Sequence, residues 1–578
     1  MKFDNPLIIQ TDRTILLDVH APLAASCRDA LIPFAELERS PEHIHTYRLT
    51  PLSLWNATSA GFSAEDAIKV LYEYARYDVP QAVEAWIRET AMRFGKLRLI
   101  EGPKGALLNG SDEYLYLETD SEAVYKEICA LPVGKKYLSP QGKEGENYRF
   151  LLSLTDRGFI KQELLKSLWP VKDDVTLKDG EPLNVSLRET TLSGKKLTIR
   201  GYQREAAEAI VGNRGAGTGF GTIVLPCGAG KTIVGMTIMD LLKTNTLIIT
   251  TNISAVHQWI DELLDKTTLT KDDIAEYTGE NKQIKPVTVA TYQILTYRKD
   301  KESEYKHFSL FRKRAWGLII YDEVHTLPAP VFRVTAEIQA IRRVGLTATL
   351  VREDGLEGNV FSLVGPKRYD VPWKELEKKG WIASAECVEI RVNLPEQKEL
   401  EYAVASTRLK HRIASENSEK LTIVQKIVSQ FPNDKILIIG QYLSQLKDAA
   451  TLLNAPIITG KIANAERDKI YNDFRENKIK VLVVSKVANF AIDLPDASIA
   501  IQISGTFGSR QEEAQRLGRI LRPKERMSRF FTLITRGTVE EEFGSNRQKF
   551  LAEQGYSYRI VSYDDENAIE NLSREFIG

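Results

Sequence analysis

A short apolar run, a glycine-containing loop and a helix follow one another in this 578-residue chain. Thr222 to Leu225 is β-branched and apolar, which is typical of a buried parallel strand. The run breaks at Pro226, and apolar residues recur at mainly helical spacing from Lys231 onward. In such an arrangement, backbone N–H groups and the positive end of the helix dipole can meet a phosphate. The order therefore predicts a parallel α/β fold that binds a phosphate-bearing ligand.

The predicted phosphate loop is a single stretch of the chain. It consists of Leu225, Pro226, Cys227, Gly228, Ala229, Gly230, Lys231 and Thr232. Lys231 adds a positive charge for the outer phosphates, and the Thr232 hydroxyl is placed to hold a magnesium ion. The strict pattern has glycine where this chain has Leu225, so an ordinary strand-to-helix turn with a surface lysine is the alternative. We favour the phosphate-binding interpretation because of residues further along the chain.

Two carboxylates follow a second apolar run, Leu318 to Tyr321. A buried strand does not normally end in adjacent acids unless a positive charge meets them. Asp322 can hold the magnesium ion, and Glu323 can orient and deprotonate an attacking water molecule. A solvated acidic turn is the alternative, and the phosphate loop upstream makes it the weaker one. His325 alone is more often a buried, hydrogen-bonded histidine than a participant.

Length and charge limit the class of protein. A chain of 578 residues can hold several domains of about 100–200 residues each. Lys plus Arg equals Asp plus Glu, 78 against 78, so a nucleic-acid site must be local. The four cysteines lack the spacing of metal ligands or of a disulfide framework. We expect a soluble, intracellular protein, because no signal-peptide core and no run of ~20 apolar residues is present.

The N-terminal part of the chain predicts two units. Residues 1–95 begin with a small hairpin and continue with helical signals, so we expect a compact, mostly helical domain. Ser40-Pro41 resembles a helix start, and Ser63-x-x-Asp66 resembles a capping box. Residues 96–190 alternate short strands with helices and predict a small α+β domain, for which a packing role is the simplest interpretation.

Two further segments alternate strands with helices, which predicts parallel sheets with crossover helices. The first is residues 191–395, which include the phosphate loop, and the second is residues 421–578. Residues 396–420 between them are rich in charge and predict a helical insertion, although a charge run is usually a solvated face. The predicted fold class is α/β, with two parallel-sheet domains, a helical N-terminal domain, a small α+β domain and a helical insertion.

Two groups of polar residues could act on the same phosphate. Thr347 and Thr349 flank an alanine at the end of another predicted strand and could sense the phosphate state. Gln515, Arg519 and Arg522 are four and three residues apart, so they share one face of a helix. Arginines delivered from another domain stabilise transition-state charge on phosphate. A surface salt-bridge helix is the alternative, and the phosphate site upstream favours the functional interpretation.

Together these motifs resemble those of superfamily 2 helicases, and specifically the XPB family of DNA repair and transcription helicases. Gln203 stands where that family reads adenine, and the chain departs from many members at Ala488-Asn489, where they have Gly-Asp. The matching segments are Leu225–Thr232 (motif I), Asp322–His325 (motif II), Gly345–Asp354 (motif III running into the RED motif), Ser485–Pro495 (motif V) and Gln515–Arg522 (motif VI).

The resemblance implies two RecA-like domains that sandwich ATP and Mg²⁺ and drive a 3′ to 5′ helicase. It makes residues 1–95 the N-terminal domain of bacterial members, residues 96–190 a damage-recognition-like domain and residues 396–420 a thumb-like insertion. The DNA substrate is expected to be single-stranded, duplex or forked. The residues expected to contact DNA or to serve unwinding are Thr291, Ser485, Lys486, Arg352, Glu353 and Asp354.

We expect a monomeric protein of the bacterial type that lies in the cytoplasm, is associated with the nucleoid and has no membrane contact. A repair nuclease or a loading partner is a possible partner, and docking to a large eukaryotic-type transcription complex is not expected. Two other functions stay open: a double-stranded DNA translocase with little unwinding, and an ATP-gated DNA-binding scaffold that recruits repair partners. Glu323 argues against the scaffold, and RNA stays open as a substrate.

Overall fold

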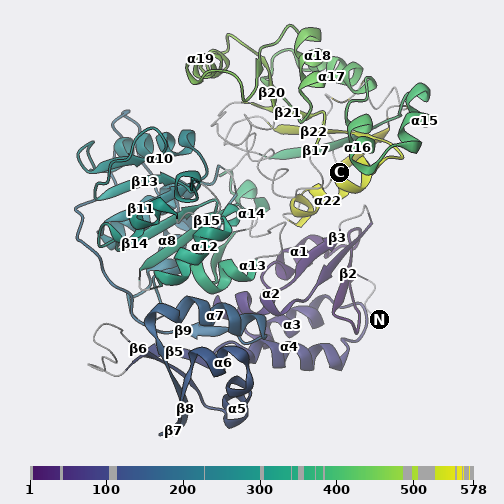
Figure 1. Ribbon diagram of the computed structural model, residues 1–578. Coiled ribbons are helices and arrows are strands. Elements are labelled where there is room, and N and C mark those ends of the chain that lie inside the picture. The colour runs from purple at the N-terminus through teal and green to yellow at the C-terminus, as the bar shows by residue number, and fades with distance from the viewer. Residues whose placement is uncertain are drawn as a thin grey trace.

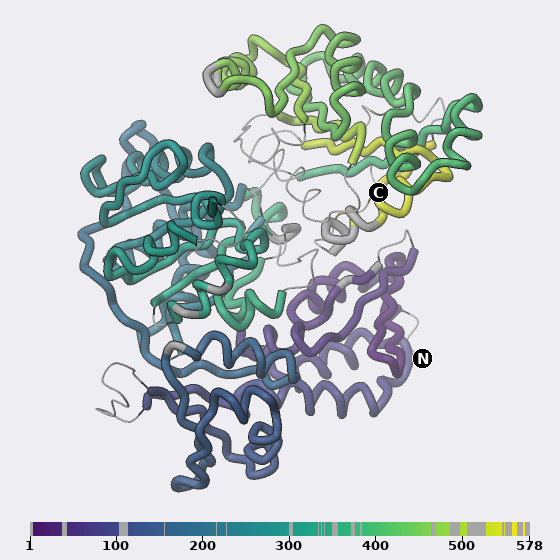
Figure 2. Tube along the Cα trace, in the orientation of Figure 1, coloured from purple at the N-terminus to yellow at the C-terminus, as the bar shows by residue number. Residues whose placement is uncertain are grey.

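Four β-sheets, each from its own part of the chain, organise the protein (Figures 1 and 2). Two of them are parallel and have seven strands each, and the two smaller sheets are mainly antiparallel. In Figure 1 the first parallel sheet lies at the left, the second at the upper right and the N-terminal units below. The computed structural model describes residues 4–39, 43–102, 114–215, 217–226, 228–299, 305–339, 341–348, 357–371, 373–381, 384–485, 497–505, 527–553, 556, 558–562, 564, 570 and 572.

The first parallel sheet contains the segment with the predicted phosphate loop. Its strands are β10 (Phe220–Val224), β11 (Thr246–Thr250), β12 (Ile274–Tyr277), β13 (Val287–Thr291), β14 (Leu318–Asp322), β15 (Arg342–Thr347) and β16 (Lys367–Asp370), in the order β12-β13-β11-β14-β15-β10-β16. The helices around it are α8 (Gly201–Val211), α9 (Lys231–Leu242), α10 (Ile253–Lys266), α11 (Tyr292–Leu295), α12 (Ala329–Glu337), α13 (Glu357–Asn359) and α14 (Trp373–Lys378).

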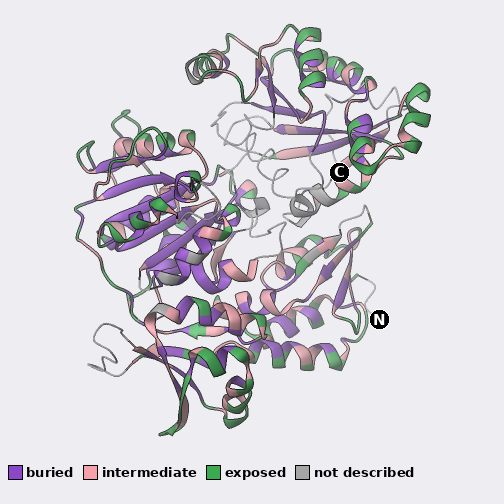
Figure 3. Ribbon diagram, viewed as in Figure 1, coloured by how far each residue is buried: buried purple, intermediate pink, exposed green. Residues whose placement is uncertain are grey.

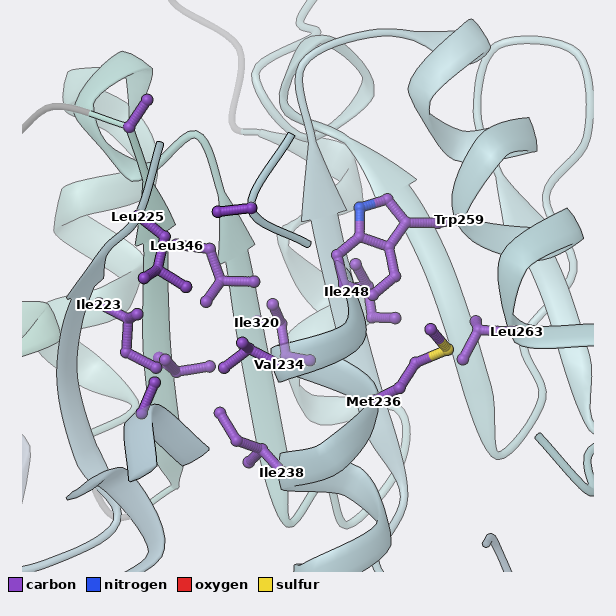
Figure 4. Packing of buried hydrophobic residues seen from close by; sticks show 14 of the residues in the cluster. Ile223, Leu225, Val234, Met236, Ile238, Ile248, Trp259, Leu263, Ile320 and Leu346 are labelled. Carbon is purple, nitrogen blue, oxygen red and sulfur yellow. The ribbon is translucent and has the colours of Figure 1, made fainter. Parts of the chain in front are cut away.

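Helices cover both faces of this sheet, which explains why the strands β10, β11 and β13 are buried along their whole length. Side chains alternate along a strand, so Ile248 and Ile320 join α8, α9 and α10 in one core, whereas Leu247 and Ile319 join α11 and α12 in another. Figure 4 shows Val234 of α9 packed among the strands, and Figure 3 shows buried strands with exposed residues on the outer helices. Full burial of each such side chain contributes about 1.5–3 kcal/mol.

The second parallel sheet begins earlier than predicted. Its strands are β17 (Ala385–Val392), β18 (Ile436–Gly440), β19 (Ile457–Ile458), β20 (Val481–Ser485), β21 (Ile499–Gln502), β22 (Ser528–Thr535) and β23 (Tyr558–Ser562), in the order β19-β20-β18-β21-β22-β17-β23. Its helices are α15 (Glu396–Val404), α16 (Thr407–Ser415), α17 (Glu419–Gln430), α18 (Leu443–Leu452), α19 (Asn464–Arg475) and α22 (Val539–Glu553).

β17 corrects the predicted boundary at residue 395. This strand pairs with β22 and β23 and therefore belongs to the second sheet. The charged stretch 396–420, predicted as a helical insertion between the two sheets, follows the first strand of the second sheet. Residues 371–384 are thus the connection between the two parallel sheets.

The N-terminal unit is less helical than predicted. Its strands are β1 (Leu7–Ile9), β2 (Thr14–Asp18), β3 (Glu36–Arg39) and β4 (Ile44–Arg48), in the order β1-β2-β4-β3, and its helices are α1 (Ala24–Leu31), α2 (Pro51–Ser59), α3 (Ala64–Tyr74) and α4 (Gln81–Arg93). Ser40 and Pro41 lie outside the described residues, and the helix expected after them is wrong because β4 follows. The capping box of Ser63 and Asp66 is confirmed at the start of α3.

The next unit has a five-stranded sheet and is fastened to the first parallel sheet. Its strands are β5 (Leu97–Glu101), β6 (Tyr114–Thr119), β7 (Ser139–Glu144), β8 (Asn147–Ser153) and β9 (Val171–Asp173), and its helices are α5 (Glu122–Ala130), α6 (Pro132–Tyr137) and α7 (Arg157–Lys166). The Lys161 Nζ donates to Asp173 Oδ2 at 2.9 Å and to Gln339 Oε1 at 2.6 Å. The buried Lys161 and Asp173 thus join α7 to the residues after α12.

In the part of the chain that the structure describes, no helix has the length and apolarity to cross a bilayer.

Candidate nucleotide site

The predicted phosphate loop and the two predicted carboxylates lie at the same edge of the first sheet. The loop begins directly after β10, and Asp322 is the last residue of β14. β15 lies between these strands, and it pairs Thr347 with Val224 and Leu346 with Asp322. Parallel strands place their carboxyl ends together, and ligands collect at that edge. Two motifs that are distant in the sequence are therefore one strand apart in space.

The backbone of the loop needs its glycines. Gly228 and Gly230 have φ of 81° and 82°, in the left-handed region where a side chain is strained. At Gly230 an added Cβ would also lie 2.5 Å from Nε2 of Gln203. Leu225, where the strict pattern has glycine, is fully buried, and its N–H donates to the carbonyl of Thr347 at 2.9 Å. Leu225 thus extends β10, and the loop proper begins after it.

The lysine of the loop pairs with the second carboxylate. The Nζ of Lys231 lies 3.1 Å from Oε1 of Glu323, and the two side chains are 12% and 21% exposed. Lys231 is the first residue of α9, and Thr232 follows it half-buried. The positive charge therefore sits at a helix N-terminus, beside a carboxylate and next to the glycine loop, where an anion can approach.

Asp322 is held by three donors. Its Oδ2 accepts from Trp259 Nε1 at 2.9 Å and from Thr250 Oγ1 at 3.3 Å, and its Oδ1 accepts from the Glu323 N–H at 3.1 Å. Burial and, to a lesser extent, the neighbouring charge of Glu323 raise the pKa of Asp322 to about 6, while the Trp259 hydrogen bond, Lys231 and the Glu323 N–H oppose the rise. Asp322 and Glu323 are two neighbouring carboxylates near Lys231, and a bound cation would stabilise their negative charge.

Glu323 and His325 connect this pair to β15. Glu323 has φ of 49°, a left-handed conformation that costs energy in a residue other than glycine. The Nδ1 of the buried His325 lies 3.5 Å from Oε2 of Glu323 and 2.6 Å from Oγ1 of Thr347. The histidine therefore bridges the carboxylate and the predicted sensor strand. The sequence favours a buried, hydrogen-bonded histidine, and the structure places His325 between Glu323 and Thr347.

Gln203 contacts the loop from the start of α8. Its Nε2 donates to the Ala229 carbonyl at 2.9 Å, and its Oε1 accepts from the Arg200 N–H at 2.9 Å. Tyr202 donates to the same carbonyl from its hydroxyl at 2.6 Å. Gln203 is only 5% exposed, so in this structure its amide holds the phosphate loop.

Two of the residues predicted to contact DNA, Thr291 and Ser485, lie in the described part of the chain, and both are buried. Thr291 ends β13 and is buried, and its hydroxyl accepts from the Ile294 N–H at 3.2 Å as the cap of α11. Ser485 ends β20 and is buried as well. The remaining predicted residues outside the described part of the chain are Cys227, Thr349, Arg352, Glu353, Asp354, Lys486, Gln515, Arg519 and Arg522.

Sequence reasoning missed the residues that orient Asp322. Trp259 lies on the apolar face of α10, where its spacing indicates only a core residue; Figure 4 shows it near Ile248 and Leu263. Tyr292 donates from its hydroxyl to the Asp322 carbonyl at 2.9 Å. Tryptophan and tyrosine usually find a partner for their polar atom when buried, and this was the available signal.

Comparison with known proteins now decides the family. A protein of Kineococcus radiotolerans named DNA 3'-5' helicase XPB is 50% identical over 97% of this chain and 97% of its own length. A protein of the same name from Mycobacterium tuberculosis is 48% identical over 97% of this chain and 98% of its own length.

The chain belongs to the XPB family of DNA helicases. The predicted resemblance is thereby confirmed. A eukaryotic XPB, the general transcription and DNA repair factor IIH helicase/translocase subunit of Encephalitozoon cuniculi, is 32% identical over 96% of this chain and 83% of its own length.

Family models match three stretches of this XPB-family chain. The model described as ERCC3/RAD25/XPB C-terminal helicase matches residues 376–575, which include the whole second parallel sheet. Type III restriction enzyme, res subunit, matches residues 196–352 and covers the phosphate loop and the two carboxylates. Helicase conserved C-terminal domain matches residues 7–141, in the N-terminal part of the chain. The predicted fold class, with two RecA-like parallel-sheet domains, is confirmed.

Proposed function

We propose that this protein is an ATP-dependent DNA helicase that moves 3′ to 5′ and acts in DNA repair. The observation that carries the proposal is the meeting of Lys231, Asp322 and Glu323 at one edge of the first RecA-like sheet. The names of the two bacterial relatives, DNA 3'-5' helicase XPB, support the substrate and the polarity.

ATP and Mg²⁺ are the proposed cofactors, and the donor set suits both. The loop 225–232 offers backbone N–H groups, and Lys231 offers a cation for the outer phosphates. Thr232 and Asp322 are the proposed ligands of the metal, since a hydroxyl and a carboxylate together with phosphate oxygens suit Mg²⁺. When bound, the metal neutralises charge that develops on the phosphate oxygens.

The protein residues then have separate tasks. Lys231 exchanges its ion pair with Glu323 for the outer phosphates of the nucleotide. Glu323, released from the lysine and oriented by His325, accepts the proton of the attacking water molecule. Gln515, Arg519 and Arg522 approach the phosphate from the second RecA-like domain and stabilise charge when the cleft closes.

Closing and opening of this cleft would alternate the grip on DNA. Thr291, Ser485 and Lys486 are proposed to stand in loops along the DNA path, with sequence-tolerant contacts to phosphates. Because the side chains of Thr291 and Ser485 are buried, their proposed contacts involve the backbone of those loops. We propose a monomer in the cytoplasm, associated with the nucleoid and assisted by a nuclease or a loading partner.

One experiment separates the proposal from its alternatives. Strand separation is measured on duplexes with a 3′ tail, a 5′ tail or a fork, next to displacement of a triplex strand from intact duplex. A 3′ to 5′ helicase opens the 3′-tailed and forked duplexes and leaves the 5′-tailed duplex closed. Triplex displacement without strand separation would identify a double-stranded DNA translocase, and ATP hydrolysis that is indifferent to DNA would favour a scaffold.

A further inference from the structure

Trp381 has a fixed position on the connection between the two RecA-like domains. Helix α14 ends in the backbone pattern of a Schellman motif: the Gly380 N–H donates to the Glu377 carbonyl and the Trp381 N–H donates to the Leu376 carbonyl, both at 2.9 Å. Gly380 supplies the left-handed residue that the motif needs, with φ of 68°. The orientation of Trp381 is therefore set by the end of α14.

From this position Trp381 contacts the start of α8. Its ring centroid lies 4.8 Å from that of Tyr202, with 33° between the ring planes. Its carbonyl accepts from Nη1 of Arg200 at 3.1 Å. Both partners belong to the first RecA-like domain, so the connecting segment is fastened to that domain at two points.

Tyr202 continues the chain of contacts to the phosphate loop. Its hydroxyl donates to the Ala229 carbonyl at 2.6 Å, and Ala229 stands between the left-handed Gly228 and Gly230. Two flanking glycines leave the direction of the Ala229 carbonyl to its hydrogen-bond partners. The Tyr202 ring, which contacts Trp381 of the connecting segment, thus belongs to a side chain that holds the loop carbonyl, as Gln203 does.

The second RecA-like domain contacts the same segment from the other side. Ala385, the first residue of β17, is only four residues beyond Trp381. A displacement of β17 is therefore transmitted to Trp381 over a short length of chain. Tyr556, which precedes β23, is buried in one apolar core with Leu376 of α14. Helix α14 therefore shares a core with a residue of the second domain, and Trp381, which follows it, contacts the ring of Tyr202. Figure 1 shows α14 at the side of the first parallel sheet that faces the second.

We propose that Trp381 is a positioning residue that transmits movement of the second RecA-like domain through Tyr202 to the Ala229 carbonyl of the phosphate loop. This inference rests on the proposed DNA-stimulated hydrolysis of ATP. When DNA draws the second domain toward the first, α14 shifts, the Trp381 ring moves Tyr202, and the loop takes the geometry that hydrolysis needs. DNA stimulation then depends on two contacts in series, the ring pair and the Tyr202 hydroxyl.

A double-mutant cycle tests the series. Trp381→Ala removes the ring contact, Tyr202→Phe keeps the ring and removes the hydroxyl, and the double variant removes both. We expect each single variant to lower the DNA-stimulated kcat by about three- to tenfold, and we expect Trp381→Ala to change the rate without DNA much less. Because the contacts act in series, the double variant should lose no more than the stronger single variant.

Controls keep the test independent of stability. Trp381→Phe should restore most of the stimulation, Trp381→Leu should not, and Lys378→Ala, at an exposed position of the same helix, should behave as the parent protein. Melting temperatures identify variants that do not fold, and Trp381→Leu with Tyr202→Phe then completes the cycle. Three results would overturn the inference. The double variant could lose the product of the two single losses, Trp381→Ala could keep full DNA stimulation, or Trp381→Ala could lose equal activity with and without DNA. A parent protein without DNA stimulation would instead count against the proposed function.

Discussion

The Nζ of Lys231 lies 3.1 Å from Oε1 of Glu323, so the residue proposed to hold phosphate and the residue proposed to activate water form an ion pair. The lysine begins α9 and the glutamate follows β14, and the pair joins these two elements across β15. Both side chains are largely buried, so removing either one leaves an uncompensated charge. In the proposed mechanism, an arriving nucleotide replaces Glu323 as the partner of Lys231, and Glu323 is then free to act on water.

Lys231→Ala should abolish ATP hydrolysis, because the outer phosphates lose their fixed cation. Steady-state hydrolysis with forked DNA is the measurement, and Lys378→Ala is the control for loss of a lysine. Turnover close to that of the parent protein would remove the phosphate loop from the account.

Trp259→Phe should raise the Mg²⁺ concentration that half-saturates hydrolysis by about tenfold, because outer-shell partners tune metal ligands. The variant keeps an aromatic ring in the core and loses the 2.9 Å hydrogen bond to Asp322. Hydrolysis is titrated with Mg²⁺ at a fixed ATP concentration, and kcat at saturating Mg²⁺ should change little. An unchanged Mg²⁺ titration would show that Trp259 serves the core alone.

Arg519→Ala and Arg522→Ala should each lower kcat by at least about 10²-fold, the usual effect of losing a group that stabilises transition-state charge. Nucleotide affinity should stay near the parent value, because most contacts to ATP come from the first RecA-like domain. Single-turnover hydrolysis and equilibrium nucleotide binding are measured together. A variant that only unfolds, shown by thermal melting with and without nucleotide, would support a surface salt-bridge helix.

Replacement of Arg352, Glu353 and Asp354 together by alanine should leave DNA-stimulated hydrolysis largely intact and sharply reduce unwinding of a forked duplex. In the sequence the three charges come shortly after the end of β15. We propose that they act on DNA or on the N-terminal domains rather than on phosphate. An exposed turn with an internal ion pair, worth about 0–1 kcal/mol, is the alternative. Equal loss of both activities would place the cluster in the ATP site, and no loss would identify that exposed turn.

Continuous apolar runs made the centre of the first sheet predictable. The strands expected at residues 222–225 and 318–321 correspond to β10 and β14. β12 was missed because Glu276 interrupts its apolar residues. β17 was missed because Glu386, Glu389 and Arg391 interrupt its apolar residues and because a charged stretch follows it. β3 was missed because Glu-Leu-Glu-Arg has a high helix propensity, and pairing with β4 overrides it.

The site divides in the same way. Lys231, Asp322 and Glu323 could be predicted because their chemistry depends on a local order of strand, loop and helix. Two other contacts depend on which distant elements the fold brings together. They are the hydrogen bond from Trp259 to Asp322 and the ring contact between Trp381 and Tyr202. Single-sequence patterns carry no information on such contacts.

Glu323→Gln tests the central claim, that ATP hydrolysis at this site drives DNA unwinding. The amide keeps the shape of the side chain but cannot accept the proton of water, so hydrolysis should slow by about 10²–10⁴-fold. ATP affinity should stay within about threefold of the parent value, which corresponds to less than about 1 kcal/mol of binding free energy. Single-turnover hydrolysis, ATP binding and opening of a 3′-tailed forked duplex are measured on one preparation. The account predicts that hydrolysis and unwinding fall together while ATP still binds, and unwinding that persists without hydrolysis, or a parallel loss of ATP affinity, would contradict it.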